Sequence, residues 1–435
     1  MINNTPVSIS KEYTYALDRM EHSRDSLFIT GRAGTGKSTL LGIFRDTTKK
    51  RCVFLAPTGV AALHIRGQTI HSFFAFPPKL ITHQEITKRK NHRLYKKVEC
   101  IVIDEISMVR VDMIDAIDKF LQKNRENSLP FGGVQMIFFG DLYQLPPVVA
   151  NAFERKYLKD HYSSQYFFSA HVMQRIRDSF EMIELHEVYR QRDKGFIRIL
   201  DSIRTRTFDI DDLEHINSRT LSQNPELPDE YITLATRNAV VNKINTTKMN
   251  ELTSEEFLFT GSIQGQFNER NPPAPPNLKL RQGAQVMFVR NDPEKRFVNG
   301  TLGIVESLDH KSIVVKIRDE STQEIKTIDV DKSTWEIIRY RYSDKNDGEI
   351  ESNVIGTYEQ YPLILAWAVT IHKSQGKTFQ HALIDLSGGA FDFGQTYVAL
   401  SRCKTLEGIY LKSPITPRDI MVDQTIAEYY LHQSL

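Results

Sequence analysis

Short apolar runs alternate with longer stretches of helical periodicity from residue 10 to about residue 340. The runs that fit buried strands are SLFIT (26–30), CVFLA (52–56), CIVID (100–104), VQMIFF (134–139) and YITLAT (231–236). This alternation predicts parallel sheets covered by helices. Each run ends in a polar or glycine-containing turn, which is where open α/β sheets place their ligand sites.

The pattern changes after NPPAPP (271–276), where apolar and polar positions begin to alternate as in half-exposed strands. Four stretches follow in this order: AQVMFVR, VNGTLGIVE, KSIVVKI and EIKTIDV. Asn299 with Gly300 predicts a tight hairpin turn. We expect a small antiparallel barrel here, of the Src-homology-3-like kind. A polar loop (343–353) ends this block and the parallel pattern resumes at YPLILAWAVTI, so the barrel is interpreted as an insertion in a second α/β lobe.

Composition adds limits on the class of protein. The chain has 435 residues, 40% of them hydrophobic, and Lys+Arg 56 against Asp+Glu 54 leaves a net charge of only +2, so a nucleic-acid partner must be argued from local features. Cys52, Cys100 and Cys403 are odd in number and lack CxxC spacing, which argues against a disulfide framework or a zinc site and fits a reducing cytosol. The start, MINNTPVSISKEY, is not a targeting signal, and LILAWAVTI is too short to span a bilayer, so we expect a cytoplasmic protein without membrane contact.

GRAGTGKS (31–38) matches the phosphate-binding loop GxxxxGK[ST]. An apolar strand precedes it and a helix-like stretch follows, which disfavours the alternative of a chance glycine-rich turn. Backbone N–H groups of such a loop curl around phosphate oxygens, Lys37 would reach the outer phosphates, and the Ser38 hydroxyl would bind Mg²⁺. We therefore expect a nucleotide with Mg²⁺, bound by Gly34, Thr35, Gly36, Lys37, Ser38 and Thr39.

IVIDEIS (101–107) is an apolar strand that ends in two carboxylates. Beside a phosphate loop, Asp104 would hold Mg²⁺, and Glu105 would orient and deprotonate the attacking water. Without that loop, a solvated acid pair at a strand end would explain the residues equally well. Hydrolysis is the expected chemistry, because a simple switch does not need Glu105 in that place.

A further apolar run is followed by an acid, an amide and then two prolines, in VQMIFFGDLYQLPPV (134–148). If this strand lies beside the Asp104 strand, Gln144 reaches the γ-phosphate side of the site, and Pro146 and Pro147 turn the chain toward the surface. Such a segment would change position when the γ-phosphate is lost and so transmit that loss to a partner bound at the surface. An ordinary strand and turn is the alternative.

Two arginines follow apolar stretches far along the chain from the phosphate loop. They are Arg190 in LHEVYRQRD (185–193) and Arg402 in YVALSRCKT (397–405). Guanidinium groups brought across a cleft stabilise the charge of a transferring phosphoryl group. Arginines are also common on surfaces, so their context must decide.

Together these segments resemble the superfamily-one helicases, and within them the PIF (petite integration frequency) family of ATP-driven DNA helicases. The resemblance runs from about residue 9 to about residue 412 and also includes AWAVTIHKSQGKTF (366–379) and YVALSRCKTLEGIYL (397–411). More specific is DMIDAIDKFLQKNRENSLPFGGVQ (112–135), which is similar to the signature that separates this family from its RecD-type relatives.

The resemblance implies two RecA-like parallel-sheet lobes, with ATP and Mg²⁺ between them and single-stranded DNA across both. By position it implies that Gly376 and Arg402 face the γ-phosphate. It also implies a set of DNA contacts, which agrees with how hydroxyls, amides and aromatic rings grip single strands: Thr58, His71, Phe73, Pro146, Arg237, Asn299, Thr301, Thr370, His372, Lys373 and Ser374.

The basic stretch 79–97 lies where this family inserts a small wedge, although on charge alone it could equally be a solvated helix face. Where relatives carry a glutamine that reads adenine, ISKEY has Tyr13, so a less strict preference for ATP is expected. The long extensions of eukaryotic members are missing, which favours a bacterial or phage-like member. The domains expected are 1–65 with 98–187 (first lobe), 66–97 (wedge), 188–277 with 361–435 (second lobe) and 278–360 (barrel).

The function expected is 5′-to-3′ movement on single-stranded DNA, with unwinding of duplex, fork, hybrid or G-quadruplex structures by a protein that is monomeric in solution and can dimerise on DNA. Roles in DNA repair and telomere maintenance fit the same family. One alternative is a nucleotide-gated binding ATPase, which would share every motif but separate no strands. A GTP-dependent switch fits poorly, because the nearest stretch to NKxD is NKIN (242–245), with Asn245 in place of the acid.

Overall fold

The computed structural model describes residues 10–77, 79–81, 86–90, 92–223, 226–228, 230–267, 272–318, 324–342 and 350–433. Residues 82–85 and 91 of the predicted basic stretch, residue 271 of NPPAPP and residues 343–349 of the predicted polar loop lie outside these ranges. Among the described helices, none combines the length and apolar character needed to cross a membrane.

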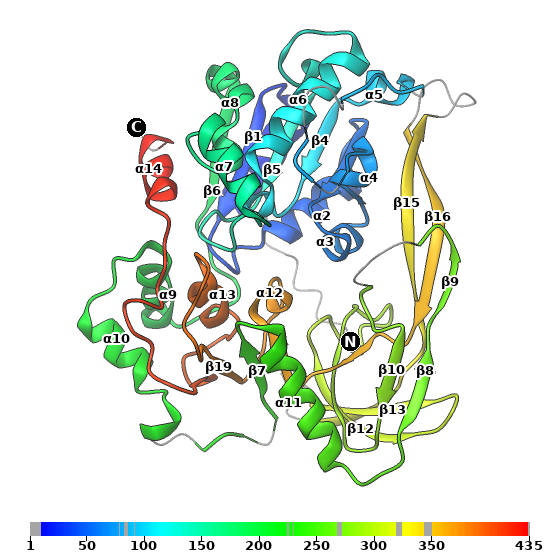
Figure 1. Ribbon diagram of the computed structural model, residues 1–435, viewed down its shortest axis with the longest axis vertical. Helices are drawn as coiled ribbons and strands as arrows, with labels where there is room; N and C mark the ends of the chain where they lie inside the picture. The colour runs from blue at the N-terminus through cyan, green and yellow to red at the C-terminus, as the bar shows by residue number, and fades with distance from the viewer. Residues whose placement is uncertain are drawn as a thin grey trace.

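A six-stranded parallel sheet forms the upper part of the molecule (Figure 1). Its strands, in spatial order, are β3 (Gln68–Thr69), β2 (Cys52–Ala56), β4 (Cys100–Ile103), β5 (Gln135–Phe139), β1 (Ser26–Gly31) and β6 (Phe180–Leu185). Every pair in this sheet is parallel. The predicted runs at 26–30, 52–56, 100–104 and 134–139 are therefore confirmed as strands to within a residue or two at their ends.

Successive residues of these strands face opposite sides, and helices cover both. Leu27 and Ile29 of β1 pack with one group of helices, whereas Phe28 packs with the other. The first group is α1 (Lys11–His22), α2 (Lys37–Thr47) and α3 (Gly59–His64); the second includes α4 (Ile70–Phe74), α5 (Arg93–Lys97), α6 (Val111–Arg125), α7 (Ala152–His161) and α8 (His171–Arg175). We call this sheet with its helices the first lobe.

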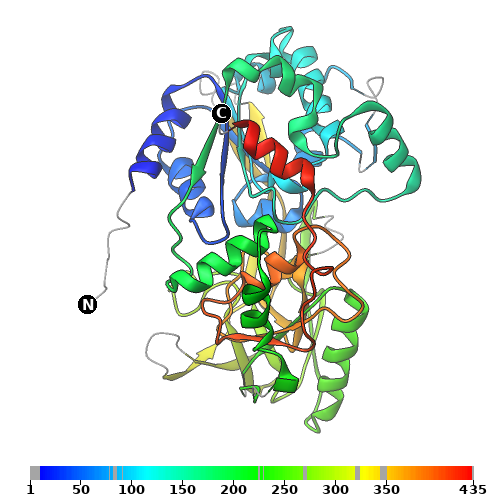
Figure 2. The same ribbon diagram turned by 90° about the vertical axis from the view of Figure 1, so that its left-hand side faces the viewer.

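A second parallel sheet has the order β18 (Ala368–Thr370), β7 (Ile232–Ala235), β19 (Ala382–Asp385) and β20 (Ile409–Leu411). With α9 (Lys194–Thr205), α10 (Ile210–Asn217), α11 (Asn238–Glu251), α12 (Ile371–Ser374) and α13 (Gln395–Leu400) it forms what we call the second lobe. The two lobes lie one above the other in Figures 1 and 2, so the carboxyl end of β1 faces the second lobe.

Three antiparallel sheets lie beside the second lobe. The largest has the order β14 (Ile325–Asp329), β13 (Ile313–Arg318), β12 (Leu302–Leu308), β11 (Gln285–Phe288) and β17 (Leu363–Leu365). The others pair β8 (Phe257–Thr260) with β10 (Asn277–Leu280), and β15 (Ser333–Tyr342) with β16 (Ile350–Gln360) and β9 (Ser262–Gly265). The antiparallel character predicted after NPPAPP is confirmed.

The predicted hairpin turn needs a correction. Asn299 and Gly300 do form a tight turn, closed by the Thr301 N–H donating to Val298 O at 3.0 Å. It does not directly join two paired strands, because β11 ends at Phe288 and residues 289–301 connect it to β12. The sequence showed the turn but not the longer connection before it.

The long β15–β16 hairpin reaches from the antiparallel sheets to the first lobe (Figure 1). The Tyr340 hydroxyl accepts a hydrogen bond from Phe54 N at 3.2 Å, and its ring lies 6.0 Å from that of Phe73. At the other side, α14 (Gln424–Gln433) returns from the second lobe to the first (Figure 2). There Tyr429 stacks on Phe168 at 4.1 Å between ring centres.

Candidate functional site

The loop 31–38 joins β1 to α2 and has the left-handed glycines that a phosphate-binding loop uses. Gly34 and Gly36 have φ of 88° and 79°, conformations that favour glycine. Lys37 Nζ donates to the carbonyl oxygens of Gly31 at 2.7 Å and Arg32 at 2.9 Å. Burial lowers the pKa of this ammonium group, while Asp141 and Glu105 act in the opposite direction. Ser38 and Thr39, at the start of α2, are exposed.

Tyr13 of α1 lies against this loop. Its hydroxyl donates to Gly36 O at 2.8 Å and lies 3.2 Å from Thr35 O. The ring is 2% exposed, and burial raises the pKa of the phenol to about 12. Tyr13 is thus a structural support of the phosphate loop.

Asp104 and Glu105 follow β4 directly. Glu105 has φ 51° and ψ 46°, a left-handed conformation that costs a non-glycine residue roughly 1 kcal/mol. Burial raises the pKa of Asp104 to about 6 and, together with the neighbouring Asp104 charge, that of Glu105 to about 7. Burial thus disfavours the ionised form of both carboxyls, and a bound divalent cation would favour it.

β5 lies between β4 and β1, as the prediction for Gln144 requires. Gln144 is 8% exposed, and an amide from the second lobe joins it to Glu105. Gln375 Nε2 lies 2.9 Å from Glu105 Oε2 and 3.1 Å from Gln144 Oε1. The structure therefore brings the predicted water-activating group and the predicted coupling residue into one hydrogen-bonded set.

The two predicted arginines meet at the same place. Arg190 donates to Ser401 O at 3.1 Å, and Arg402 is 1% exposed with its guanidinium on the Val398 carbonyl at 2.8 Å. No carboxylate forms an ion pair with either arginine among the described residues. Burial and the Arg190 charge lower the pKa of Arg402 to about 9. Buried guanidinium groups without an acid partner are suited to an anion such as a triphosphate.

Gly376 lies close to Arg402, whose guanidinium donates to Lys377 O at 3.3 Å. A Cβ added at Gly376 would meet no protein atom within 4 Å, so the backbone there borders an opening. The donor set fits ATP, and the Ser38 hydroxyl and the Asp104 carboxyl are oxygen groups of the kind that Mg²⁺ prefers. Among the described residues, no group of three or more His, Cys, Asp or Glu side chains could hold a metal ion by itself.

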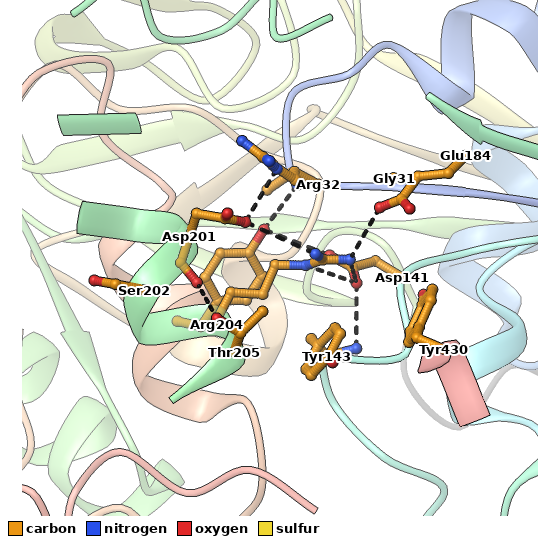
Figure 3. A network of polar contacts seen from close by, with 12 residues as sticks. Gly31, Arg32, Asp141, Tyr143, Glu184, Asp201, Ser202, Arg204, Thr205 and Tyr430 are labelled. Carbon is orange, nitrogen blue, oxygen red and sulfur yellow. Dashed lines mark hydrogen bonds and ion pairs between the residues drawn. The ribbon is translucent and has the colours of Figure 1, made fainter. Parts of the chain in front are cut away.

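A buried ion pair joins the lobes next to this site (Figure 3). Arg204 of α9 pairs with Asp141 after β5 at 3.0 Å. The Tyr397 hydroxyl of α13 lies 3.4 Å from Asp141 Oδ2 and accepts the N–H of Ala33 in the phosphate loop at 2.8 Å. The second lobe therefore contacts both the phosphate loop and the Gln144 segment.

The predicted DNA contacts divide by exposure. Thr58, Arg237 and Lys373 are exposed, and His71, Asn299, Thr301 and His372 are partly exposed. The other four predicted side chains are buried: Phe73, Pro146, Thr370 and Ser374.

Protein atoms cover those four side chains in this structure, and their contact with DNA stays a prediction. The Phe73 ring is 3% exposed and packs edge-on against Tyr95 and Tyr340. Thr370 Oγ1 accepts the Lys373 N–H, and Ser374 Oγ donates to Ile371 O, so both hydroxyls serve α12 itself. Pro146 is covered, and the chain first emerges at Val148, which is 64% exposed.

Sequence reasoning missed four residues of the site. Gln375 and Tyr397 lie in segments that carried the family resemblance, so an amide next to Gly376 and a hydroxyl five residues before Arg402 were available signals. Asp141 was visible beside Gly140. Arg204 had no local signal, because its partner lies 63 residues away in the sequence.

Comparisons with known proteins agree with this geometry. The PIF1-like helicase family matches residues 9–212, and the 2B domain of the DNA helicase Pif1 matches residues 268–308. The ATP-dependent DNA helicase Pif1 of Bdellovibrio bacteriovorus is 32% identical over 98% of this chain and 92% of its own length. The chain spans 63% of the length of the Emericella nidulans ATP-dependent DNA helicase PIF1, with 29% identity.

Solved structures of a Bacteroides sp Pif1 are also similar. The unliganded structure matches with a TM-score of 0.86 and 37% identity, covering 98% of this chain and 97% of that one. The complex with ADP-AlF4 matches with a TM-score of 0.87 and 37% identity, covering 98% of this chain and 97% of that one. The structure bound to single-stranded DNA matches with a TM-score of 0.69 and 38% identity, covering 98% of this chain and 96% of that one.

Proposed function

Because this chain belongs to the PIF1-like helicase family of ATP-dependent DNA helicases, we propose that it moves 5′-to-3′ on single-stranded DNA and unwinds duplexes, forks, RNA-DNA hybrids or G-quadruplexes ahead of it. The observation that carries this proposal is the Gln375 amide, which bridges Glu105 and Gln144 across the lobe interface. Through this bridge, a change in the second lobe reaches the group that activates water.

ATP is bound by the loop 31–38, where Lys37 exchanges its bonds to Gly31 O and Arg32 O for the outer phosphates. Ser38 and Asp104 would hold Mg²⁺, which when bound would neutralise charge on the phosphates. Glu105 removes a proton from water, whose oxygen attacks the γ-phosphorus as the bond to the β-phosphate oxygen breaks and ADP leaves. Arg190, Arg402 and the Gly376 backbone face the transferring phosphoryl group and stabilise its charge.

DNA lies across both lobes, and contacts from both hold it. Thr58 from the first lobe and Arg237 and Lys373 from the second offer exposed groups to the phosphates, and His71, Asn299, Thr301 and His372 flank them. Closing on ATP and opening after hydrolysis moves the lobes along the strand, with Gln144 coupling the two sites.

The five-stranded antiparallel sheet acts as the Src-homology-3-like barrel, and residues 66–97 act as the wedge at the strand junction. The domain limits that we propose are 1–65 with 98–187, 66–97, 188–277 with 361–435, and 278–360. We propose a cytoplasmic monomer that binds single-stranded DNA and duplex junctions. Dimerisation on DNA is proposed by analogy, since two coordinating Pif1 helicases have been described at forked double-stranded DNA.

The test is ATP-dependent unwinding of one duplex with either a 5′ or a 3′ single-stranded tail, with Lys37→Ala as the inactive control. Unwinding only from the 5′ tail is the expected result. Unwinding from the 3′ tail would overturn the direction. DNA-stimulated hydrolysis with no unwinding from either tail would instead identify a nucleotide-gated binding ATPase.

A further inference from the structure

The ion pair between Arg204 and Asp141 is sealed from water at the boundary between the lobes. The Arg204 side chain is 5% exposed and that of Asp141 is 0% exposed. The Tyr143 ring centre lies 4.5 Å from the guanidinium carbon and the Tyr430 ring centre 5.8 Å, as Figure 3 shows. Burying such a pair contributes little to stability compared with apolar packing, so its presence points to a role in fixing or switching a geometry.

Asp141 shapes the turn that carries Gln144. Its Oδ1 accepts the Tyr143 N–H at 3.2 Å as well as the Arg204 guanidinium, and its main-chain carbonyl accepts the Gln144 N–H at 3.0 Å. Its Oδ2 faces the Tyr397 hydroxyl and the Gln144 amide, at 3.4 Å and 3.5 Å. Both carboxylate oxygens thus have a partner from the second lobe.

The same turn is closed in from its other side by α13. A Cβ added at Gly394, the residue before α13, would lie 2.3 Å from Tyr143 O and 2.7 Å from Gln144 O. In this arrangement of the lobes the turn therefore contacts α9 through Arg204 and packs closely against the residue before α13. From Gln144 the contacts continue through Gln375 to Glu105.

We propose that Arg204 is a positioning residue for hydrolysis, through which the second lobe sets the Gln144 turn and, by way of Gln375, the Glu105 carboxylate. While the lobes are in contact, the pair holds the turn in register with Glu105. When they separate, Asp141 loses Arg204 and Tyr397 together and the turn is released. This inference rests on the proposed function, since it concerns the coupling of that hydrolysis to lobe contact.

The test compares Arg204→Met, which keeps the length of the side chain but removes its charge, with Arg204→Lys, which keeps the charge. Arg198→Met is the matched control: Arg198 is on the same helix, but its ion pair at 2.6 Å is with Asp212 of α10, inside the second lobe. A fourth variant, Arg204→Met with Asp141→Asn, removes both charges and so avoids a buried unpaired carboxylate.

We measure kcat and KM for ATP with and without single-stranded DNA, and DNA affinity. Arg204→Met should lower the DNA-stimulated kcat about tenfold or more, with KM and DNA affinity changed by less than about twofold. Arg204→Lys should recover a substantial part of the lost DNA-stimulated kcat, and Arg198→Met should have the kcat of the wild type. The double variant should have a kcat no lower than that of Arg204→Met alone.

Wild-type kcat in Arg204→Met overturns the inference, as does wild-type kcat in the folded double variant if Arg204→Met itself does not fold. A parallel loss of nucleotide and DNA binding in both variants also overturns it, because that is the result of general disruption. Unwinding of the 5′-tailed duplex by the wild-type protein is measured alongside. An inactive wild type removes the proposed function and this inference together, whereas an active wild type with an equally active Arg204→Met removes the inference alone.

Discussion

Replacing Glu105 with Gln should abolish hydrolysis and yet make the nucleotide-free protein more stable at alkaline pH. Gln has nearly the same shape, can still accept from Gln375 Nε2, and bears the same left-handed backbone, so strain cancels in the comparison. What changes is the charge. Burial, with the neighbouring Asp104, raises the pKa of Glu105 from 4.5 to about 7, so holding the ionised form in the folded state costs free energy.

The size and sign follow from proton linkage. Between pH 4.5 and about 7 the folded protein binds more protons at Glu105 than the unfolded chain does, so the free energy of unfolding falls as pH rises through that range. At about 1.4 kcal/mol per pKa unit the full penalty is at most about 3.5 kcal/mol, and about 1–2 kcal/mol is expected because the side chain is partly exposed. The penalty is complete above about pH 7 and mostly gone near pH 5.

Urea unfolding at about pH 8 and about pH 5.5 measures this directly. Glu105→Gln should exceed wild type in unfolding free energy at the higher pH, and the gain should shrink at the lower one. Glu99→Gln is the control: the exposed Glu99 has its pKa lowered by its hydrogen bond from Arg51, so its effect should be small, opposite in sign and equal at both pH values. An equal gain for Glu105→Gln at both pH values, or none, would refute the electrostatic account of this site.

Further expectations concern single groups around the same site. Lys37→Ala should eliminate ATP turnover but leave single-stranded DNA affinity within about twofold, measured by hydrolysis and fluorescence anisotropy. Gln144→Ala should keep basal hydrolysis and lose its stimulation by DNA. Stimulation equal to that of the wild type would refute the proposal that Gln144 couples hydrolysis to DNA binding. Gly394→Ala places a methyl group 2.3 Å from Tyr143 O, so it should lower both the melting temperature and DNA-stimulated hydrolysis, whereas Gly42→Ala, which meets nothing within 4 Å inside α2, should be neutral or stabilising by up to about 1 kcal/mol. Tyr13→Phe loses the hydroxyl contact with Gly36 O and should cost about 1 kcal/mol in thermal unfolding.

The parallel sheets and the phosphate site could be predicted because their signals are local. Buried parallel strands read as continuous apolar runs, and a phosphate loop places its glycines and lysine within eight consecutive residues, 31–38. The predicted position of the Gln144 strand beside the Asp104 strand is confirmed for the same reason, since both are strong apolar runs that end in polar residues.

What could not be predicted depends on partners far apart in the chain. Arg204 reads as one more charged residue of an amphipathic helix, and only the folded chain brings it to Asp141. Phe73 and Ser374 lie in segments that are predicted to face DNA, but the sequence does not show which side chains of a short helix turn inward. The β15–β16 hairpin also escaped prediction, because Tyr340 meets Phe54 across 286 residues of sequence.

The path of the chain restricts how the lobes can move relative to one another. One crossing runs from the end of β6 at Leu185 to the start of α9 at Lys194, and a second runs from the end of β20 at Leu411 to α14, which begins at Gln424 and docks on the first lobe. The β15–β16 hairpin also meets the first lobe, at Tyr340, so the two lobes are attached at three places while α14 stays docked. Docking of α14 therefore limits the relative positions that the two lobes can take, and a helicase that returns to the same arrangement after every cycle depends on such limits.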